Sequence, residues 1–289
     1  MVSISVRPLT PEDVPAAHAS SFTTFTVLDA RDGLPAPDHT EERRRWGEAR
    51  IAAMQRSDPA GAWCAVEGDR LVGVALATRR GPLWFLSLLT VDVTAQGAGL
   101  GRRLLEAARG TANDASAGLI CSSDDPRALH RYASLGFTLL PAYEGRGTVD
   151  RSALPAVSGV RDGSWTDDRE RVDALAVEIR GAPLGPDGEA FAAGGAQLLI
   201  ADGPDGRGYA VVRSYGVAPV AATTPAAARA LLVTGLAAVT GEVTVGFVTE
   251  RQRWAVEVLL ELRLPFRTGG SLAVDRFDAA PYLPSGAFG

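Results

Sequence analysis

The chain contains no lysine, so all 29 of its basic residues are arginine. It therefore has no amine side chain for Schiff-base chemistry, and it lacks the lysine with which a P-loop reaches phosphates. Two cysteines and three histidines are also too few, and too widely spaced, to indicate a disulfide framework or a zinc site. We expect no metal cofactor.

Long hydrophobic runs are missing as well. Residues 1–7 have no hydrophobic signal core, and no later run approaches the length that spans a membrane. We expect a cytoplasmic protein in which Cys64 and Cys121 are reduced and act as small buried residues. The net charge of −5 gives no indication of a nucleic-acid partner, and a membrane partner is not expected either. With 289 residues, 46% of them hydrophobic, the chain is long enough for one large domain or two ordinary ones.

The most informative pattern runs from Pro82 to Ala112. An apolar run over 83–93 predicts a buried strand, and the apolar residues after position 100 share one helical face. Between them lies Gln96-Gly97-Ala98-Gly99-Leu100-Gly101. Three glycines allow a tight turn and a close approach of the backbone to a ligand. The amide groups at the following helix N-terminus favour an anion, so this segment predicts a phosphate-binding loop.

Three alternatives compete with this interpretation. A dinucleotide-binding loop needs Gly-x-Gly-x-x-Gly followed by an acidic residue, whereas the spacing here is Gly-x-Gly-x-Gly. A P-loop is excluded by the missing lysine. A glycine-rich turn that serves packing alone is the simplest alternative, but three glycines in a strand–loop–helix context favour a phosphate site.

The loop resembles the pyrophosphate loop of the GNAT superfamily of acyl-CoA N-acyltransferases, which reads Gln/Arg-x-x-Gly-x-Gly/Ala. A second family motif, Ala-x-x-x-Tyr-x-x-x-Gly-Phe, is matched by residues 128–137, with the tyrosine at Tyr132. The family often has proline where this chain has Val93, which is a mild departure. The resemblance covers roughly residues 1–150.

The resemblance implies direct transfer of an acetyl group from acetyl-CoA to an amine. The N–H of Thr90 or Val91 would polarise the thioester carbonyl, and Tyr132 would protonate the departing thiolate. A packing role is the alternative for Tyr132. Asp92 and His130 are weak candidates for a general base, and no base is assigned. The residues expected to bind the cofactor are Leu89, Thr90, Val91, Gln96, Gly97, Ala98, Gly99, Leu100, Gly101 and Arg102.

The order of predicted elements in the first half returns in the second half, which suggests a duplicated fold. The second copy has Val220–Ala226 in place of the glycine loop and Glu261 in the slot of Tyr132. We therefore expect an α/β (α+β) protein of two tandem GNAT-like domains, each a mixed, mostly antiparallel sheet flanked by helices. Residues 1–152 would form the catalytic domain and residues 153–289 a degenerate copy.

Local patterns also predict individual elements, among them a helix over 126–135 capped by Asp124 or Asp125 and a helix over 225–238 capped by Thr224. Two helical segments are expected over 12–19 and 21–30, followed by a mobile loop over 31–40. Pairs of short strands are expected near the end of each half. They are placed at 136–140 and 147–150, and at 264–266 and 271–277.

The function expected from these features is acetylation of a small-molecule amine. Two alternatives stay open: a sensor that binds CoA without turnover, and a protein or peptide N-acetyltransferase. The second half would either complete the acceptor pocket or serve packing and homodimer formation. The sequence does not identify the acceptor.

Overall fold

The computed structural model describes residues 4–31, 33, 40–97, 99–280 and 282–289. By its internal contacts the chain divides into two compact units. The first unit comprises Met1–Arg79 and Trp84–Ala115, and the second comprises Arg80–Leu83 and Ser116–Gly289. The loop expected over 31–40 falls largely outside the described residues.

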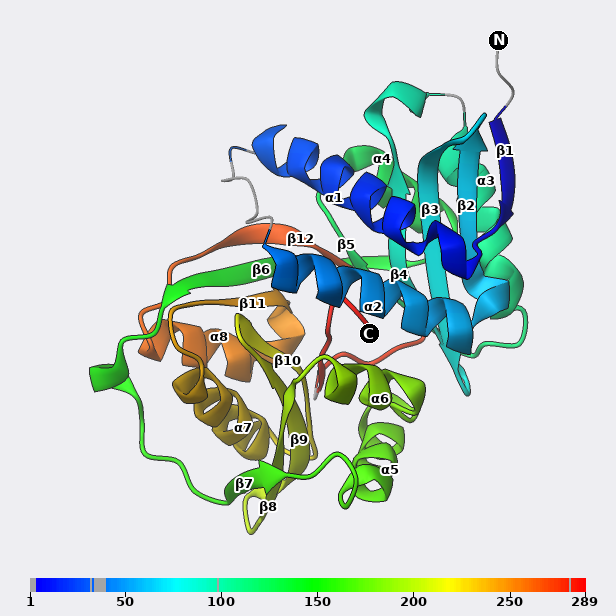
Figure 1. The fold of residues 1–289 in the computed structure, drawn as a ribbon. Helices are drawn as coiled ribbons and strands as arrows, with labels where there is room; N and C mark the ends of the chain where they lie inside the picture. Colours follow the sequence, from blue (N-terminus) through cyan, green and yellow to red (C-terminus); the bar gives the residue numbers. More distant parts are fainter. Residues whose placement is uncertain (1–3, 32, 34–39, 98, 281) are drawn as a thin grey trace. The chain divides into compact units, whose positions relative to one another are not determined.

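The first unit is a sheet flanked by helices (Figure 1). Its strands follow the order β1-β2-β3-β4, and β2 is antiparallel to both β1 and β3. Helices α1 and α2 lie on one face of these strands and α3 on the other (Figure 1). The elements are β1 (Ile4–Pro8), α1 (Val14–Arg31), α2 (Glu41–Ser57), β2 (Ala62–Glu67), β3 (Arg70–Arg80), β4 (Leu83–Val91) and α3 (Leu100–Ala108), with short 3-10 turns η1 (Pro11–Asp13), η2 (Pro59–Gly61), η3 (Val93–Ala95) and η4 (Arg109–Ala112).

Helix α1 is one continuous helix, so the prediction of two separate segments over 12–19 and 21–30 was wrong. The hydroxyl side chains near the expected boundary are accommodated within the helix. The hydroxyls of Ser21, Thr24 and Thr26 each donate a hydrogen bond to the carbonyl four residues earlier, at 2.7 to 2.9 Å. Such back-bonding satisfies a hydroxyl without ending a helix.

The second unit contains a longer mixed sheet with strand order β5-β12-β6-β11-β10-β9-β8-β7, and β13 pairs with β10. Its elements are β5 (Ala117–Ser122), α4 (Pro126–Ser134), β6 (Thr138–Thr148), η5 (Arg151–Ala153), β7 (Val160–Gly163), α5 (Arg169–Arg180), α6 (Pro186–Ala193), β8 (Gln197–Gly203), β9 (Gly206–Arg213), β10 (Gly216–Ala222), α7 (Pro225–Ala238), β11 (Glu242–Val248), η6 (Glu250–Gln252), α8 (Arg253–Glu261), β12 (Phe266–Asp275) and β13 (Tyr282–Leu283). Helices α7 and α8 pack together over a core of valine, leucine and alanine from β8 to β11.

Strands β6 and β12 each pair with strands of the other half of the sequence. Strand β12 is antiparallel to both β5 and β6, and β6 is in turn antiparallel to β11. Each is a single strand, so the expected pairs of short strands were wrong. Strand β12 continues through a register shift against β6 that lies between Thr268 and Ser271, around Gly269-Gly270.

This pairing explains why the compact units differ from the predicted domains. Residues 116–152 belong to the first half of the sequence, yet they pack with the second half because β12 lies between β5 and β6. The predicted domain boundary between residues 152 and 153 marks the point where the two sequence copies would meet. That boundary stays a prediction. The fold class is as predicted: a mostly antiparallel mixed sheet with flanking helices.

A repeated ion pair at the start of each copy supports the duplication. In β1, Arg7 forms a two-point pair with Asp13, with N···O distances of 2.6 and 2.8 Å. In β7, Arg161 forms the same pair with Asp168, at 2.9 and 2.5 Å. In both cases the carboxylate also accepts a backbone N–H, and the arginine also donates to the carbonyl of the residue that follows it.

Candidate functional site

The predicted phosphate loop lies in the first unit, between β4 and α3. After β4 ends at Val91, the chain makes the η3 turn and reaches Gln96, whose Nε2 donates a hydrogen bond of 3.0 Å to the Val91 carbonyl. The Asp92 N–H donates to the Val72 carbonyl at 2.9 Å, which holds the loop to β3. The sequence predicts that Gln96 contacts the cofactor. In the structure its side chain connects the loop to the end of β4.

Gly97 and Gly99 have φ values of +93° and +72°, in the region that side chains with a Cβ rarely adopt. A Cβ added at either position would meet no atom of the described residues within 4 Å, chain neighbours apart. Glycine is therefore required here by backbone conformation and not by close packing against the described residues. Ala98 lies outside the described residues.

Helix α3 begins directly after Gly99, and two of its first amide groups have no partner among the described residues. The N–H groups of Arg102 and Arg103 both donate to the Gly99 carbonyl, at 3.1 and 3.2 Å. Those of Leu100 and Gly101 form no hydrogen bond with any residue that the structure describes. Unpaired amides and the positive end of the helix dipole together favour an anion.

Two side chains beside these amides have different environments: Leu100 is buried and apolar, and Arg102 is exposed and charged. Leu100 is buried at 2% exposure, together with Leu104, Leu105 and Ala108 on the same helix face. This packing fixes the direction of α3. The Arg102 side chain is 71% exposed and lies 3.6 Å from Glu106, so it is accessible to an anionic ligand.

The end of β4 carries the other predicted cofactor contacts. Thr90 is buried, and its Oγ1 lies 3.3 Å from the Ser21 Oγ of α1, a contact between residues 69 apart that the sequence did not indicate. Leu89 and Val91 are half-buried on either side of it. Their roles toward a cofactor stay predictions.

Asp92 serves as the cap of η3. Its carboxylate accepts hydrogen bonds from the Thr94 N–H and hydroxyl, at 2.8 and 2.6 Å, and Arg70 lies 3.3 Å away. The two bonds from Thr94 lower the pKa of Asp92, and the Arg70 charge adds to that effect. A carboxylate with a lowered pKa is a weak proton acceptor, which argues against Asp92 as the general base.

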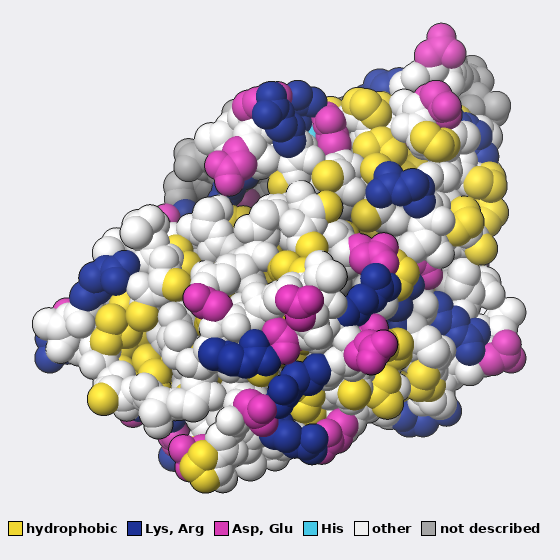
Figure 2. All heavy atoms as spheres, turned by 60° about the horizontal axis from the view of Figure 1, so that its bottom comes forward, with side chains coloured by type: hydrophobic (Ala, Val, Ile, Leu, Met, Phe, Trp, Pro, Cys, Tyr) yellow, Lys and Arg dark blue, Asp and Glu magenta, His cyan; other side chains and the backbone are white. Residues whose placement is uncertain are grey.

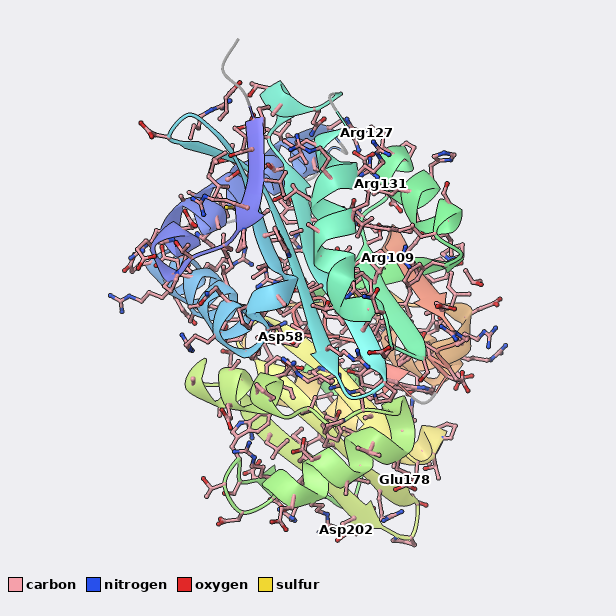
Figure 3. The ribbon with its side chains drawn as sticks, turned by 90° about the vertical axis from the view of Figure 1, so that its right-hand side faces the viewer. Asp58, Arg109, Arg127, Arg131, Glu178 and Asp202 are labelled. Carbon is pink, nitrogen blue, oxygen red and sulfur yellow. The ribbon has the colours of Figure 1, made fainter. Side chains whose placement is uncertain are left out.

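Tyr132 lies on α4, in the second unit. Asp125 caps this helix, as predicted, by accepting the Arg127 N–H at 2.8 Å. Figure 3 labels Arg127 and Arg131 of the same helix. The Tyr132 side chain is 4% exposed, and burial raises its pKa to about 12. His130 is exposed on this helix.

The raised pKa keeps the Tyr132 phenol protonated at neutral pH. Its hydroxyl forms no hydrogen bond with any described residue of its own unit. A raised pKa also makes the phenol a weaker acid, so the shift by itself does not favour proton donation. The role of Tyr132 as the acid stays a prediction.

The second copy uses the corresponding groups internally. Thr224 caps α7, as predicted, by accepting the Ala227 N–H at 3.1 Å, and its hydroxyl donates to the Asp205 carbonyl. Glu261, in the slot that Tyr132 occupies in the first copy, forms an ion pair with Arg229. The described part of this loop thus contains a side-chain cap in place of the open glycine turn.

Among the described residues, no three His, Cys, Asp or Glu side chains come together as a metal site would require. None of the helices formed by these residues has both the length and the apolar character needed to cross a lipid bilayer.

Comparisons with known proteins place the fold. Residues 27–137 match the Acetyltransferase (GNAT) family. A putative acetyltransferase from Pyrococcus horikoshii is similar over 100% of this chain and 97% of its own, with 18% identity and a TM-score of 0.73. A tandem GNAT protein from the clavulanic acid biosynthesis pathway is similar over 94% and 98%, with 17% identity and a TM-score of 0.58. No curated protein matches the sequence.

A GCN5-related N-acetyltransferase from Sphaerobacter thermophilus is similar to the same extent, over 94% of this chain and 95% of its own, with 16% identity and a TM-score of 0.58. Residues 27–137 thus match the GNAT family, and the fold of the whole chain is similar to that of a tandem GNAT protein. Both findings agree with the resemblance inferred from the two motifs.

Proposed function

We propose that this protein is an N-acetyltransferase that moves the acetyl group of acetyl-CoA directly to the amine of a small molecule. The observation that carries the proposal is the glycine turn with open amides at the start of α3. Amides of Gly97 to Gly101 would hold the pyrophosphate, with Arg102 as an added cation. The cosubstrate supplies an activated thioester, whose carbonyl carbon is the electrophile.

In the transfer, the acceptor nitrogen forms a bond to the carbonyl carbon, and the carbon–sulfur bond breaks. The N–H of Thr90 or Val91 would stabilise the negative charge on the carbonyl oxygen. Tyr132 would donate its proton to the leaving sulfur and regain one from solvent, and the proton on the attacking nitrogen would pass to water as the amide forms.

Direct transfer is supported by the state of the two cysteines. Burial raises the pKa of the Cys64 thiol to about 11 and raises that of Cys121 further. A thiol with such a pKa is almost entirely protonated at neutral pH, and only a thiolate is a good nucleophile. Neither cysteine is suited to form an acyl-enzyme intermediate, and the chain has no lysine that could form one.

A small-molecule acceptor agrees with the surface charges. On the face shown in Figure 2, acidic and basic side chains are interspersed over the surface. Binding to a nucleic acid typically uses a basic stripe or patch, and the net charge of −5 is also unfavourable for it.

The test measures free thiol released from acetyl-CoA, with the full chain and a panel of small amines, amino acids and short peptides. We expect thiol release that depends on a small amine and is lost in Gly99→Asp. Binding of CoA in calorimetry without thiol release for any amine would favour the sensor. Turnover of peptides alone would favour the protein acetyltransferase.

A further inference from the structure

The second unit contains a pocket of about 400 Å³ that has no role in the proposed transfer. Its floor is formed by the start of β6 and the end of β12, where Thr138 pairs with Val274. Strands β11 and β12 are both antiparallel to β6, so they run parallel to each other and their carboxyl ends meet at one edge. The pocket lies at this edge and is lined by Thr138, Leu140, Arg251, Val274, Arg276, Phe277, Asp278 and Ala279.

The walls of the pocket are tied together by a buried amide. Gln252 is fully buried, next to Arg251 in η6. Its Oε1 accepts from the Thr249 N–H and hydroxyl, at 2.8 and 2.6 Å, and its Nε2 donates to the carbonyls of Ala279 and Tyr282, at 2.7 and 2.9 Å. All four hydrogen-bonding positions of this amide are therefore used to hold η6 against the chain that follows β12.

Further contacts fix the chain segment that follows β12, which lines the pocket with Phe277, Asp278 and Ala279. The Trp254 Nε1 donates to the Ala280 carbonyl at 3.2 Å, and the rings of Phe277 and Tyr282 meet edge to face at 6.0 Å. The Asp278 Oδ1 accepts the Ala280 N–H at 3.0 Å. The pocket is thus formed by chain segments that are fixed by hydrogen bonds, and a preorganised site loses less entropy when it binds a ligand.

The charges of the lining have both signs. The Arg251 guanidinium forms no hydrogen bond or ion pair with any residue that the structure describes, whereas Arg276 pairs with the adjacent Asp275 at 3.2 Å. Asp278 has its second oxygen, Oδ2, without a partner among the same residues. Leu140, Val274 and Phe277 supply an apolar surface beside these groups.

We propose that this pocket binds a small zwitterion with an apolar side chain, of the α-amino acid class. The carboxylate would contact Arg251 and Arg276, the ammonium group would contact Asp278, and the side chain would cover Leu140 and Phe277. A simple anion fits less well, because Asp278 would repel it. The volume is at the small end of the range of ligand sites, which suits a single amino acid. The proposal does not depend on acetyl transfer.

The experiment is isothermal titration calorimetry of the full chain with L-leucine and L-phenylalanine, in the absence of acetyl-CoA. N-acetyl-L-leucine lacks the ammonium group, and L-leucinamide lacks the carboxylate. We expect both analogues to bind at least about tenfold more weakly than L-leucine. Inorganic phosphate is titrated separately, and binding of phosphate but of neither amino acid would overturn the proposal in favour of an anion site.

Substitutions of residues that line the pocket test whether the amino acid binds there. Arg251→Gln and Asp278→Asn should each weaken L-leucine binding by about tenfold or more. Arg253→Gln is the matched control, because Arg253 is an exposed arginine two residues away that pairs with Glu257 outside the pocket lining. Equal melting temperatures of the two arginine variants would show that folding is intact. Affinity unchanged in both pocket variants, or no binding of either amino acid up to about 10 mM, would overturn the proposal.

Discussion

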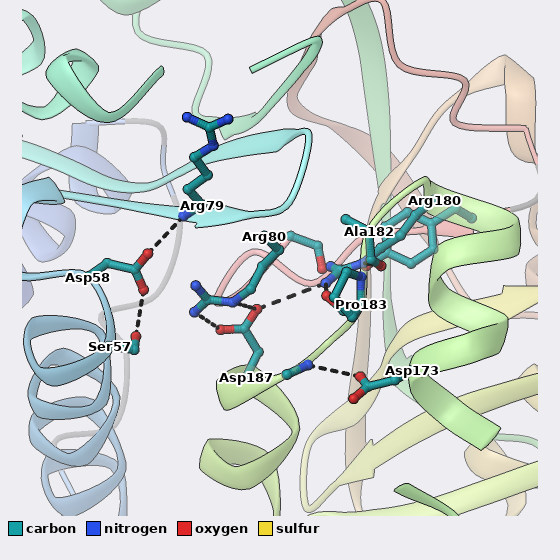
Figure 4. A network of polar contacts seen from close by, with 12 residues as sticks. Ser57, Asp58, Arg79, Arg80, Asp173, Arg180, Ala182, Pro183 and Asp187 are labelled. Atoms are coloured by element: carbon teal, nitrogen blue, oxygen red, sulfur yellow. Dashed lines mark hydrogen bonds and ion pairs between the residues drawn. The ribbon is translucent and has the colours of Figure 1, made fainter. Parts of the chain in front are cut away.

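Arg80 and Asp187 form a two-point ion pair in the interior of the second unit (Figure 4). The Arg80 Nε and Nη2 lie 3.0 and 2.5 Å from the two carboxylate oxygens, and the side chains are 8% and 1% exposed. Arg180 lies 4.0 Å from the same carboxylate and donates to the carbonyls of Ala182 and Pro183. A single buried carboxylate thus faces two buried guanidinium groups.

Removing this carboxylate should be strongly destabilising. Asp187→Ala leaves two buried cations without their counterion, and we expect a loss of about 3–5 kcal/mol in the free energy of unfolding. Urea titration measures it. Asp202→Ala is the control, because the exposed pair of Asp202 with Arg171 contributes only about 0–1 kcal/mol (Figure 3). A similar loss in both variants would contradict a special role for the buried pair.

The double variant Arg80→Met/Asp187→Leu separates the charge from the packing. It replaces Arg80 and Asp187 with apolar side chains and leaves one buried cation, Arg180, without the carboxylate in place of two, so it should be more stable than Asp187→Ala. A double variant less stable than the single one would show that shape at this position matters more than charge. The same urea titration makes this comparison.

Gly99 provides a direct test of the phosphate loop. Gly99→Ala adds only a methyl group at φ +72°, whereas Gly99→Asp also brings a negative charge beside the amides at the start of α3. We expect a modest loss of CoA affinity for alanine and loss of detectable binding for aspartate, measured by calorimetry. Gly110→Ala is the control, since Gly110 lies in the η4 turn with open space around its Cβ position. CoA affinity retained in Gly99→Asp would remove the loop from the site.

The features that were predicted from the sequence are those that local chemistry decides. The caps Asp125 and Thr224, and helix α7 over Pro225–Ala238, follow from residues within a few positions of each other. The glycine turn was found because positive φ at Gly97 and Gly99 requires that residue type. The part of the candidate site that was predicted is therefore the glycine turn, which a few neighbouring residues determine.

The features that were missed depend on distant partners. Nothing in residues 266–275 indicates that this strand lies between β5 and β6, because alternation of side chains predicts a strand and leaves its neighbours undefined. Arg80 and Asp187 are 107 positions apart, and each alone resembles a surface residue. The contact between Thr90 and Ser21 is equally non-local.

The two repeated ion pairs predict how stability responds to acid. Hydrogen bonding by the Arg161 guanidinium, with help from the Ser164 N–H, lowers the pKa of Asp168 to about 2, below the unfolded value of about 3.9. A lowered folded pKa gives stability that is fully present above about pH 4 and is lost as the pH falls towards 2. The free-energy difference between the wild type and Asp168→Asn should therefore shrink between pH 4 and pH 2.

Urea titrations at several pH values measure this difference. Asp13→Asn should behave in the same way, because its bond to Arg7 lowers the pKa of Asp13 to about 2. A difference that stays constant down to pH 2 would show that the carboxylate charge does not contribute to stability.

Tyr132→Phe tests the proposed acid while keeping the buried ring. Without the hydroxyl the leaving thiolate must take its proton from water, and loss of a general acid typically lowers turnover by about 10²–10⁴-fold. The affinity for CoA should stay within about twofold, because the phosphate loop is unchanged. Tyr143→Phe is the matched control, since Tyr143 is an exposed tyrosine on β6. Steady-state kinetics give kcat and calorimetry gives the CoA affinity of each variant. Turnover equal to that of Tyr143→Phe would assign Tyr132 to packing alone.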